Sequence, residues 1–220
     1  MILEIDSVDL EFDGIKVLYG IYIRSEKGKV TGILGRNGSG KTCLIRILFG
    51  DLQPRYKNIR SNEKCFPKPM YQTGIIGYLP QYPLLPKNIK INLAFKLFNV
   101  SWDSFTAHFP DFKKYDKARI KNLSSGEIRV IETYLILLSQ KEIILLDEPF
   151  SFIAPLFVQK FKDLINEKKK TCNIIVTDHF YKDILEVSDT IYLLKNGCSK
   201  EIKGKEELVS EGYLNKGLIE

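Results

Sequence analysis

Residues 35 to 42 read Gly-Arg-Asn-Gly-Ser-Gly-Lys-Thr and match the phosphate-binding pattern G-x-x-x-x-G-K-[ST] at every fixed position. In this pattern the glycines let backbone N–H groups turn inward around a phosphate, the lysine reaches the terminal phosphates, and the threonine hydroxyl binds Mg²⁺. We therefore expect a nucleoside triphosphate and Mg²⁺ to be held by Gly35, Asn37, Gly38, Ser39, Gly40, Lys41 and Thr42.

The segments on either side of this loop have the composition that a phosphate site requires. Residues 29–34 are a short, mostly apolar stretch typical of a strand, and residues 42–49 are an apolar stretch typical of a helix that ends at Gly50. A strand, loop and helix in this order place the anion at a helix N-terminus. The alternative, a glycine-rich turn without a ligand, does not explain these flanks.

Two carboxylates follow a second apolar run. Residues 143–146 are Ile-Ile-Leu-Leu, as expected for a strand buried on both faces of a parallel sheet, and Asp147 and Glu148 come next. Such a sheet binds its ligands at the carboxyl ends of its strands. We expect Asp147 to hold Mg²⁺ through water and Glu148 to accept a proton from the water that attacks the γ-phosphate. The alternative is an acidic helix start.

The segment Leu123-Ser124-Ser125-Gly126-Glu127 is by itself a helix N-cap sequence. In its position between the two nucleotide motifs it resembles the LSGGQ signature of the ATP-binding cassette (ABC) family, with Ser125 in place of the second glycine. The resemblance implies that two nucleotide-binding domains pack head to tail. Ser124 and Gly126 of one domain would then close over the γ-phosphate of the ATP held by the other.

The same resemblance implies functions for three further residues. Gln81, after a short apolar strand, matches the family's Q-loop glutamine, which contacts Mg²⁺ or the attacking water; alternatively it is an ordinary surface residue. His179 follows the apolar run 174–176 and matches the switch histidine, which orients that water. Phe12 matches the aromatic residue that stacks on adenine, although the alternation Val8, Leu10, Phe12 also fits a strand residue in the core.

One segment departs from the family pattern. After Pro149 the family commonly has Thr-Ser-Ala-Leu-Asp, whose aspartate reaches across the dimer, whereas this chain has Phe150-Ser151-Phe152-Ile153-Ala154. The side chain of Ala154 can neither donate nor accept a hydrogen bond. We expect the coupling between the two nucleotide sites to be altered, with Ser151 retaining part of the contact.

The resemblance covers nearly the whole chain and implies a single ABC nucleotide-binding domain over 1–220. The expected fold is α/β, a P-loop NTPase core of mostly parallel sheet with an antiparallel β subdomain and an α-helical subdomain. The core would comprise 1–81 and 141–210, and the helical subdomain about 82–140. Expected strands lie within 2–34, near 59–65 and 74–79, and at 142–147, 173–178 and 190–195; expected helices are 89–98 with Asn88 as N-cap, 128–139, 155–170 and one from about 180.

Composition limits the remaining possibilities. No window approaches 18 consecutive apolar residues, the start of the chain carries acids unlike a signal peptide, and the four cysteines lack metal-ligand spacing. We therefore expect a cytoplasmic protein with reduced thiols. The net charge of +6 permits an acidic partner such as a lipid surface, but the lysines are dispersed along the sequence and nucleic acid is not expected as a partner.

Together these features favour an ATP-binding and hydrolysing subunit of an ABC transporter, peripheral on the inner face of the cell membrane. Its partners would be a second copy of itself or a related ABC subunit, and integral membrane subunits that dock on residues 82–86 with parts of 88–109. The alternatives are a soluble ABC ATPase that does not act in transport, and a degenerate domain that binds ATP without hydrolysing it.

Overall fold

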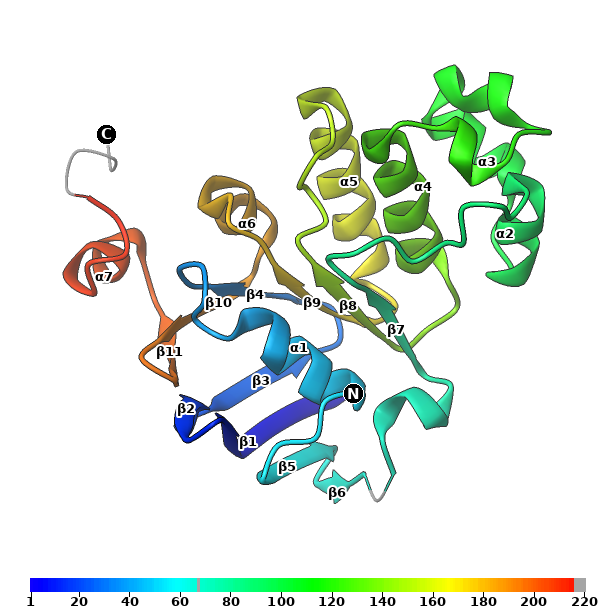
Figure 1. Ribbon diagram of the computed structural model, residues 1–220. Coiled ribbons are helices and arrows are strands. Elements are labelled where there is room, and N and C mark those ends of the chain that lie inside the picture. The colour runs from blue at the N-terminus through cyan, green and yellow to red at the C-terminus, as the bar shows by residue number, and fades with distance from the viewer. Residues whose placement is uncertain (67, 216–220) are drawn as a thin grey trace.

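The helix that follows the phosphate loop lies between two β-sheets (Figure 1). The computed structural model describes residues 1–66 and 68–215. Helix α1 (Lys41–Phe49) buries Leu44, Ile45 and Leu48 in one apolar cluster with residues of both sheets. Because this helix is apolar on both sides, it can fill the space between the sheets. The start of α1, where the phosphate loop ends, is therefore held rigidly.

The larger sheet has six strands in the order β11-β10-β4-β9-β8-β7. All neighbouring strands pair in parallel except β10 and β11, which form an antiparallel hairpin. The strands are β4 (Val30–Leu34), β7 (Ile76–Leu79), β8 (Ile143–Asp147), β9 (Asn173–Thr177), β10 (Thr190–Lys195) and β11 (Cys198–Ile202). Every residue of β4, β7, β8 and β9 is buried, as the continuous apolar run 143–146 predicted for β8.

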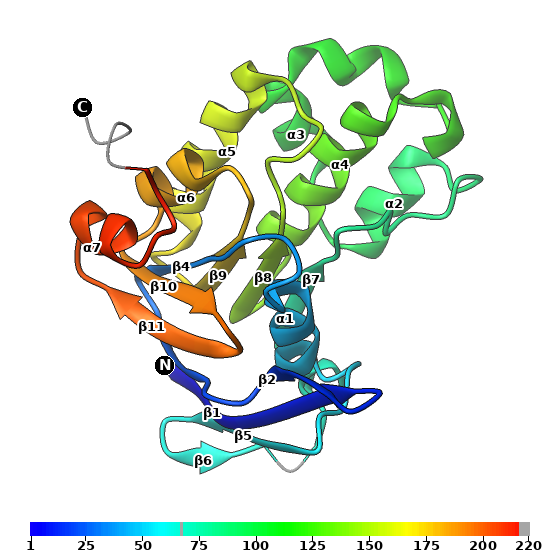
Figure 2. The ribbon, with the colours of Figure 1, turned by 60° about the vertical axis from the view of Figure 1, so that its left-hand side comes forward.

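The smaller sheet is antiparallel, and all its strands come from the first 65 residues (Figure 2). Its strands are β1 (Ile2–Phe12), β2 (Ile15–Leu18), β3 (Tyr22–Glu26), β5 (Tyr56–Ser61) and β6 (Lys64–Cys65). The strand expected near 59–65 is thus two strands, because Asn62 and Glu63 turn the chain with φ of 45° and 68°.

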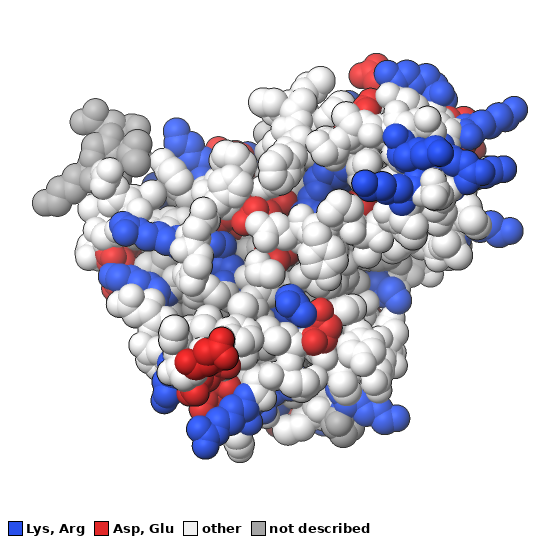
Figure 3. Space-filling view, viewed as in Figure 1, with Lys and Arg blue, Asp and Glu red and all other residues white. Residues whose placement is uncertain are grey.

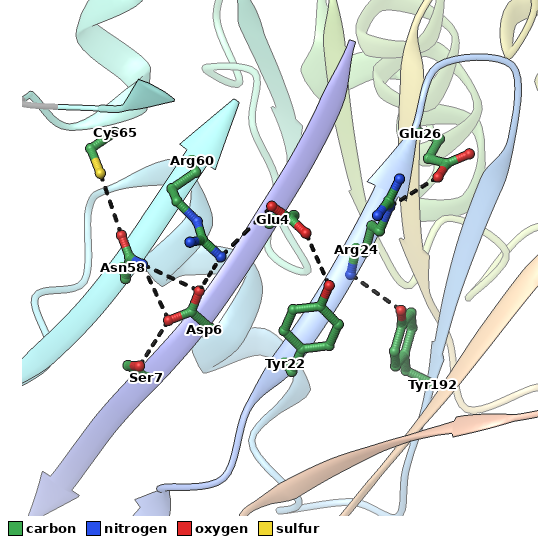
Figure 4. A network of polar contacts seen from close by, with 10 residues as sticks. All are labelled: Glu4, Asp6, Ser7, Tyr22, Arg24, Glu26, Asn58, Arg60, Cys65 and Tyr192. Carbon is green, nitrogen blue, oxygen red and sulfur yellow. Dashed lines mark hydrogen bonds and ion pairs between the residues drawn. The ribbon is translucent and has the colours of Figure 1, made fainter. Parts of the chain in front are cut away.

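The outer face of this sheet carries a network of polar side chains (Figure 4). Arg60 donates to Asp6 at 2.7 Å, and the hydroxyl of Tyr22 donates to Glu4 at 2.9 Å. The opposite face of β1 buries Leu3 and Ile5. This alternation of polar and apolar residues specifies the register of β1 against its neighbours. The fold class predicted from the sequence, a mostly parallel sheet with an antiparallel sheet and a helical region, is confirmed.

Three helices cover the other face of the large sheet (Figures 1 and 2). They are α4 (Ser125–Leu138), α5 (Pro155–Lys168) and α6 (Tyr181–Val187). Each of these helices was predicted, α4 from a slightly later start. The short C-terminal helix α7 (Lys205–Ser210) and strand β11 were not predicted.

The chain between β7 and α4 forms a small helical region around an aromatic cluster. It contains α2 (Ile91–Leu97), α3 (Trp102–His108) and the 3₁₀ turns η2 (Pro110–Tyr115) and η3 (Ile120–Asn122), while the 3₁₀ turn η1 (Met70–Thr73) precedes β7. The ring of Phe105 lies 5.0 to 5.2 Å from the rings of Phe95, Phe109, Phe112 and Tyr134.

The predicted N-cap at Asn88 is wrong. Helix α2 begins at Ile91, after Lys90. Residues 87–88 form a turn and Lys90 is extended. This conformation is held because Ile120 donates its N–H to the carbonyl of Ile89 at 3.1 Å and Ile91 donates to Ala118 at 3.0 Å. A pairing with a segment about 30 residues away therefore overrides the local cap signal.

Candidate functional site

The phosphate loop connects β4 to α1 and is a compact turn. Its glycines Gly38 and Gly40 have φ of 80° and 98°, a backbone conformation that other residues rarely adopt. A Cβ on Gly40 would lie 2.8 Å from a methyl group of Leu18. The Nζ of Lys41 donates to the carbonyls of Gly35 at 2.8 Å and Arg36 at 3.3 Å. Burial lowers the pKa of Lys41, and nearby carboxylates oppose that effect.

This loop forms one wall of a cavity of about 420 Å³. The cavity brings together the loop and residues from three distant parts of the sequence: Phe12, Val17, residues 37–43, Gln81 and Glu148. Phe12 is 47% exposed at the end of β1, so it is not the core residue that the strand alternation also allowed. A larger cavity of about 690 Å³ lies on the other side of the loop, but it contains neither Gln81 nor Glu148.

Asp147 is fully buried at the end of β8. Its Oδ1 accepts a hydrogen bond from the hydroxyl of Thr177 at 2.6 Å, whereas its Oδ2 has no hydrogen-bond partner among the described residues. Burial raises the pKa of Asp147, while the Thr177 and Thr42 hydroxyls lower it. A buried carboxylate oxygen without a partner, close to a threonine hydroxyl, is a suitable oxygen donor for Mg²⁺ or for its bound water. The residues present therefore fit this ion.

Glu148 has a strained backbone that turns its side chain out of the strand. Its φ is 53°, in the left-handed region that costs a non-glycine residue about 1–3 kcal/mol. The backbone is held from both sides, because its N–H donates to the carbonyl of Thr177 at 2.8 Å and its carbonyl accepts from Arg129 at 2.8 Å. Strain of this kind is common at functional sites.

The carboxylate of Glu148 lies beside two other polar side chains. The hydroxyl of Ser151 donates to Glu148 Oε2 at 3.3 Å, and His179 Nδ1 lies 3.4 Å from the same oxygen. His179 and Ser151 are themselves 3.5 Å apart. The structure therefore brings the predicted base and the predicted histidine together, with Ser151 beside both.

Arg129 is a site residue that was not predicted. It lies on α4, is 6% exposed, and donates to three backbone carbonyls: Pro80 at 2.6 Å, Asp147 at 2.5 Å and Glu148 at 2.8 Å. Pro80 immediately precedes Gln81, so one guanidinium connects the ends of β7 and β8. Burial lowers the pKa of Arg129, and Glu132 and Asp147 partly offset this effect. The signal in the sequence was two charged residues, Arg129 and Glu132, within the mostly apolar stretch 128–138.

Glu132 lies one turn further along α4 and is fully buried. One of its carboxylate oxygens accepts the backbone N–H groups of Leu84 and Leu85, each at 2.8 Å. Burial raises the pKa of Glu132, although both hydrogen bonds and Arg129 act to lower it. Leu85 itself is 6% exposed and belongs to the core, so it is not available to a docking partner. Leu84 is half-buried, and the docking of a membrane subunit on residues 82–86 stays a prediction. Tyr82, 58% exposed, is accessible, as are Pro83 and Pro86.

Ser124 and Gly126 lie at the start of α4 and are not among the residues that line the 420 Å³ cavity. The Ser124 hydroxyl accepts the N–H of Glu127, and the Glu127 carboxylate accepts the N–H of Ser124, which is a complete capping box. A Cβ on Gly126 would lie 2.6 Å from the carbonyl oxygen of Phe152. Glycine is therefore required here for the close packing of α4 against the segment 150–154.

The segment 150–154 presents apolar rather than polar side chains. Phe152 is 80% exposed and has a φ of 66°. Ala154 is the N-cap residue of α5 and provides no side-chain hydrogen bond. The segment is fixed by Asp178, whose carboxylate accepts the N–H groups of Phe150 and Phe180, each at 3.1 Å. Asp178, with its pKa raised by burial, therefore links the segment 150–154 to the residue that follows His179.

Among residues 1–66 and 68–215, no helix is both long enough and apolar enough to cross a membrane. Within the same residues, no group of three or more histidine, cysteine, aspartate or glutamate side chains is arranged to bind a metal ion. A metal at the 420 Å³ cavity would therefore need oxygen donors from Thr42, from its ligand and from water, together with Asp147.

Comparison with known proteins agrees with this geometry. The profile of the family described as ABC transporter matches residues 18–151. The chain is 28% identical over 205 residues to a probable metal transport system ATP-binding protein of Thermotoga maritima, which covers 88% of this chain and 81% of that protein. It is 25% identical over 218 residues to the high-affinity branched-chain amino acid transport ATP-binding protein BraG of Pseudomonas aeruginosa, with 89% of each covered. A nucleotide-free ATP-binding cassette from an ABC transporter has a similar fold, with a TM-score of 0.79, 22% identity, and 98% and 96% of the two chains covered.

Proposed function

This chain belongs to the ABC transporter family, and we propose that it binds Mg²⁺-ATP in the 420 Å³ cavity and hydrolyses it with Glu148 as the general base. It is an ATP-binding ATPase subunit of a transport system. The observation that carries the assignment of the site is the cavity itself, in which the phosphate loop, Gln81 and Glu148 meet.

The phosphates are held by the loop and by the first turn of α1. The first backbone N–H groups of a helix have no acceptor within the helix and attract anions. Lys41 exchanges its contacts with the carbonyls of Gly35 and Arg36 for contacts with the terminal phosphates. Phe12, exposed at the cavity's edge, stacks on the adenine, which favours ATP only modestly because any base offers a similar face.

Asp147 and Thr42 hold Mg²⁺, with Gln81 as an additional contact. This assignment is supported by the unpartnered, buried Oδ2 of Asp147. Mg²⁺, when bound, would offset the negative charge of the phosphates.

Glu148 accepts the proton of the attacking water. His179 and Ser151 contact the carboxylate, and Gln81 lines the same cavity. A base positioned in this way contributes about 10² to 10⁴-fold to the rate. The left-handed backbone of Glu148 aims the side chain into the cavity instead of along the strand.

A second copy of this chain, or a related subunit, completes the site with its Ser124 and Gly126. Within one chain these residues lie outside the nucleotide cavity, which supports a function across an interface. The hydroxyl of Ser124 and the N-terminus of α4 are suitable groups for a γ-phosphate. Ala154 cannot make the cross-dimer polar contact that the family's aspartate makes.

The transport system also requires membrane subunits, and we place this subunit on the cytoplasmic face of the membrane, docked through the region around Tyr82. The two relatives described above are named for a metal and for branched-chain amino acids. No cargo is therefore assigned to this chain.

The test compares Glu148→Gln with Glu142→Gln, a matched change at the exposed opposite end of β8. Glu148→Gln should bind ATP with unchanged affinity and hydrolyse it about 10² to 10⁴-fold more slowly. Glu142→Gln should behave like the wild type. Hydrolysis by Glu148→Gln at the wild-type rate would show that another group is the base.

A further inference from the structure

Most of the protein's net positive charge lies in one short stretch. Residues 82–124 contain eight basic side chains, three acidic ones and hence a net charge of +5, whereas the whole chain of 220 residues has +6. The eight are Lys87, Lys90, Lys96, Lys113, Lys114, Lys117, Arg119 and Lys121. The remaining 177 residues are therefore almost neutral.

The fold brings several of these residues together. The segments 87–91 and 118–121 run side by side, since Lys121 donates its N–H to the carbonyl of Lys87 at 2.8 Å and Lys90 forms a bridge with Arg119. Residues that are about 30 positions apart thus become neighbours. Figure 3 shows the result as a group of blue side chains over the helical region, where Figure 1 labels α2 and α3.

All eight side chains are exposed, and none of them takes part in an ion pair among the described residues. Elsewhere the basic residues are often paired, as Arg60 is with Asp6 and Lys200 with Glu211. The acids of the stretch, Asp103, Asp111 and Asp116, do not neutralise the cluster. Like charges held close together destabilise a fold, so the cluster has a cost that an anionic partner would remove.

Apolar side chains accompany the charges on α2. Leu93 and Leu97 are 46% and 67% exposed. They lie one turn apart, on the face that also carries Lys90 at the start of the helix. A surface that presents lysines beside exposed leucines is typical of contact with a membrane interface, where the charges meet headgroups and the leucines enter the acyl boundary.

We propose that this basic face of the helical region binds the anionic headgroups of phospholipids at the surface of the membrane. Lipid is favoured over nucleic acid because the exposed apolar residues on α2 are aliphatic, not aromatic groups on which bases could stack. The choice of lipid over an acidic protein segment rests on the proposed function, which places this subunit beside membrane components.

The test uses the purified full chain and vesicles, without nucleotide. Vesicles of phosphatidylcholine alone are compared with vesicles that also contain phosphatidylglycerol, at low and high salt. The wild type should bind only the anionic vesicles, and binding should weaken as salt screens the charges. Each basic residue near such a surface strengthens binding about fivefold, so the variant Lys87→Gln/Lys117→Gln/Lys121→Gln should bind roughly 100-fold more weakly.

A matched control is Lys27→Gln/Lys64→Gln/Lys205→Gln, three exposed lysines outside the helical region. Both triple variants reduce the net charge from +6 to +3. The control should keep most of the binding, and both variants should keep the wild-type ATPase rate because all six positions lie outside the nucleotide cavity.

Equal losses in the two variants would overturn the proposal, since they would show a net-charge effect without a defined face. Equal binding to neutral vesicles would overturn it too. If the wild type ignores all vesicles but loses a membrane-subunit partner when Lys87, Lys117 and Lys121 are changed, the partner of this face is an acidic protein segment. None of these outcomes affects the proposed ATPase, which the Glu148→Gln experiment tests separately.

Discussion

Replacement of Arg129 by methionine should both destabilise the protein and slow hydrolysis. The variant keeps a long side chain but removes the donor to Pro80, Asp147 and Glu148, and it leaves the buried Glu132 without its neighbouring positive charge. Three hydrogen bonds from a charged donor, at about 1.5–3 kcal/mol each, set an upper limit. The cost of burying the guanidinium in the wild type offsets part of this, so we expect a net loss of about 3–5 kcal/mol.

For a chain of this length, each kcal/mol lowers the unfolding temperature by about 2–4 °C, so Arg129→Met should lower it by roughly 6–20 °C. Circular dichroism melting of the nucleotide-free protein measures this. Arg55→Met, at an exposed position, is the control and should melt within about 1 °C of the wild type. Arg129→Lys should recover only part of the loss, because an ammonium lacks the planar fork of guanidinium donors.

The kinetic result distinguishes positioning from mere stability. Without Arg129 the strained backbone of Glu148 can relax and the turn that carries Gln81 can separate from β8. At a temperature where the variant is folded, we expect kcat to fall by about 10²-fold with little change in ATP affinity, since the phosphate loop is untouched. This reasoning would be refuted if Arg129→Met unfolded at the same temperature as the wild type, or if the folded variant hydrolysed ATP at the wild-type rate.

Three further outcomes can be measured. Burial raises the pKa of Glu132 in the folded state above the ordinary glutamate pKa of about 4.3. The contribution of this carboxyl group to the free energy of unfolding is therefore greatest below about pH 4.3, and it is lost as the pH rises through the raised pKa. As the pH rises from 4 to 7, the unfolding temperature of the wild type should therefore decrease relative to that of Glu132→Gln. A difference that stays constant with pH would contradict this prediction. Ala154→Asp should raise the unfolding temperature by about 1–8 °C by capping α5, and should change the cooperativity of hydrolysis more than the affinity for ATP; a lower melting temperature would show that the cap does not form. With Mg²⁺ and ATP, Glu148→Gln should elute as a dimer in size-exclusion chromatography at tens of micromolar, whereas Lys41→Ala, which loses phosphate contacts, should remain monomeric.

The sequence was most informative where the relevant physics is local. The phosphate loop depends on glycines that neighbour one another, and β8 depends on a continuous apolar run, so both could be predicted. The functions of Arg129 and Glu132 could not, because their partners at residues 80, 84, 85, 147 and 148 become neighbours only through the packing of α4.

The same reason explains two other differences. Asn88 is a good cap residue by type, but the pairing of residues 89–91 with 118–120 takes the chain out of the helix at that point. The lysines of the helical region are dispersed along the sequence, and that pairing is also what gathers them. Charge clusters of this kind cannot be read from spacing along the chain.

The strand order of the large sheet has a consequence for biosynthesis. Strand β4 pairs with β9 and β10. The pairing of Val30 with Ile174 cannot form until Ile174, 144 positions later in the chain, has been synthesised. At about 5–20 residues per second, this wait is roughly 7–30 s. The antiparallel sheet, by contrast, has all its strands once residue 65 has left the ribosome. A nascent chain therefore carries an unpaired, mostly apolar strand beside an early-forming sheet for many seconds, and during that interval a chaperone would need to protect β4.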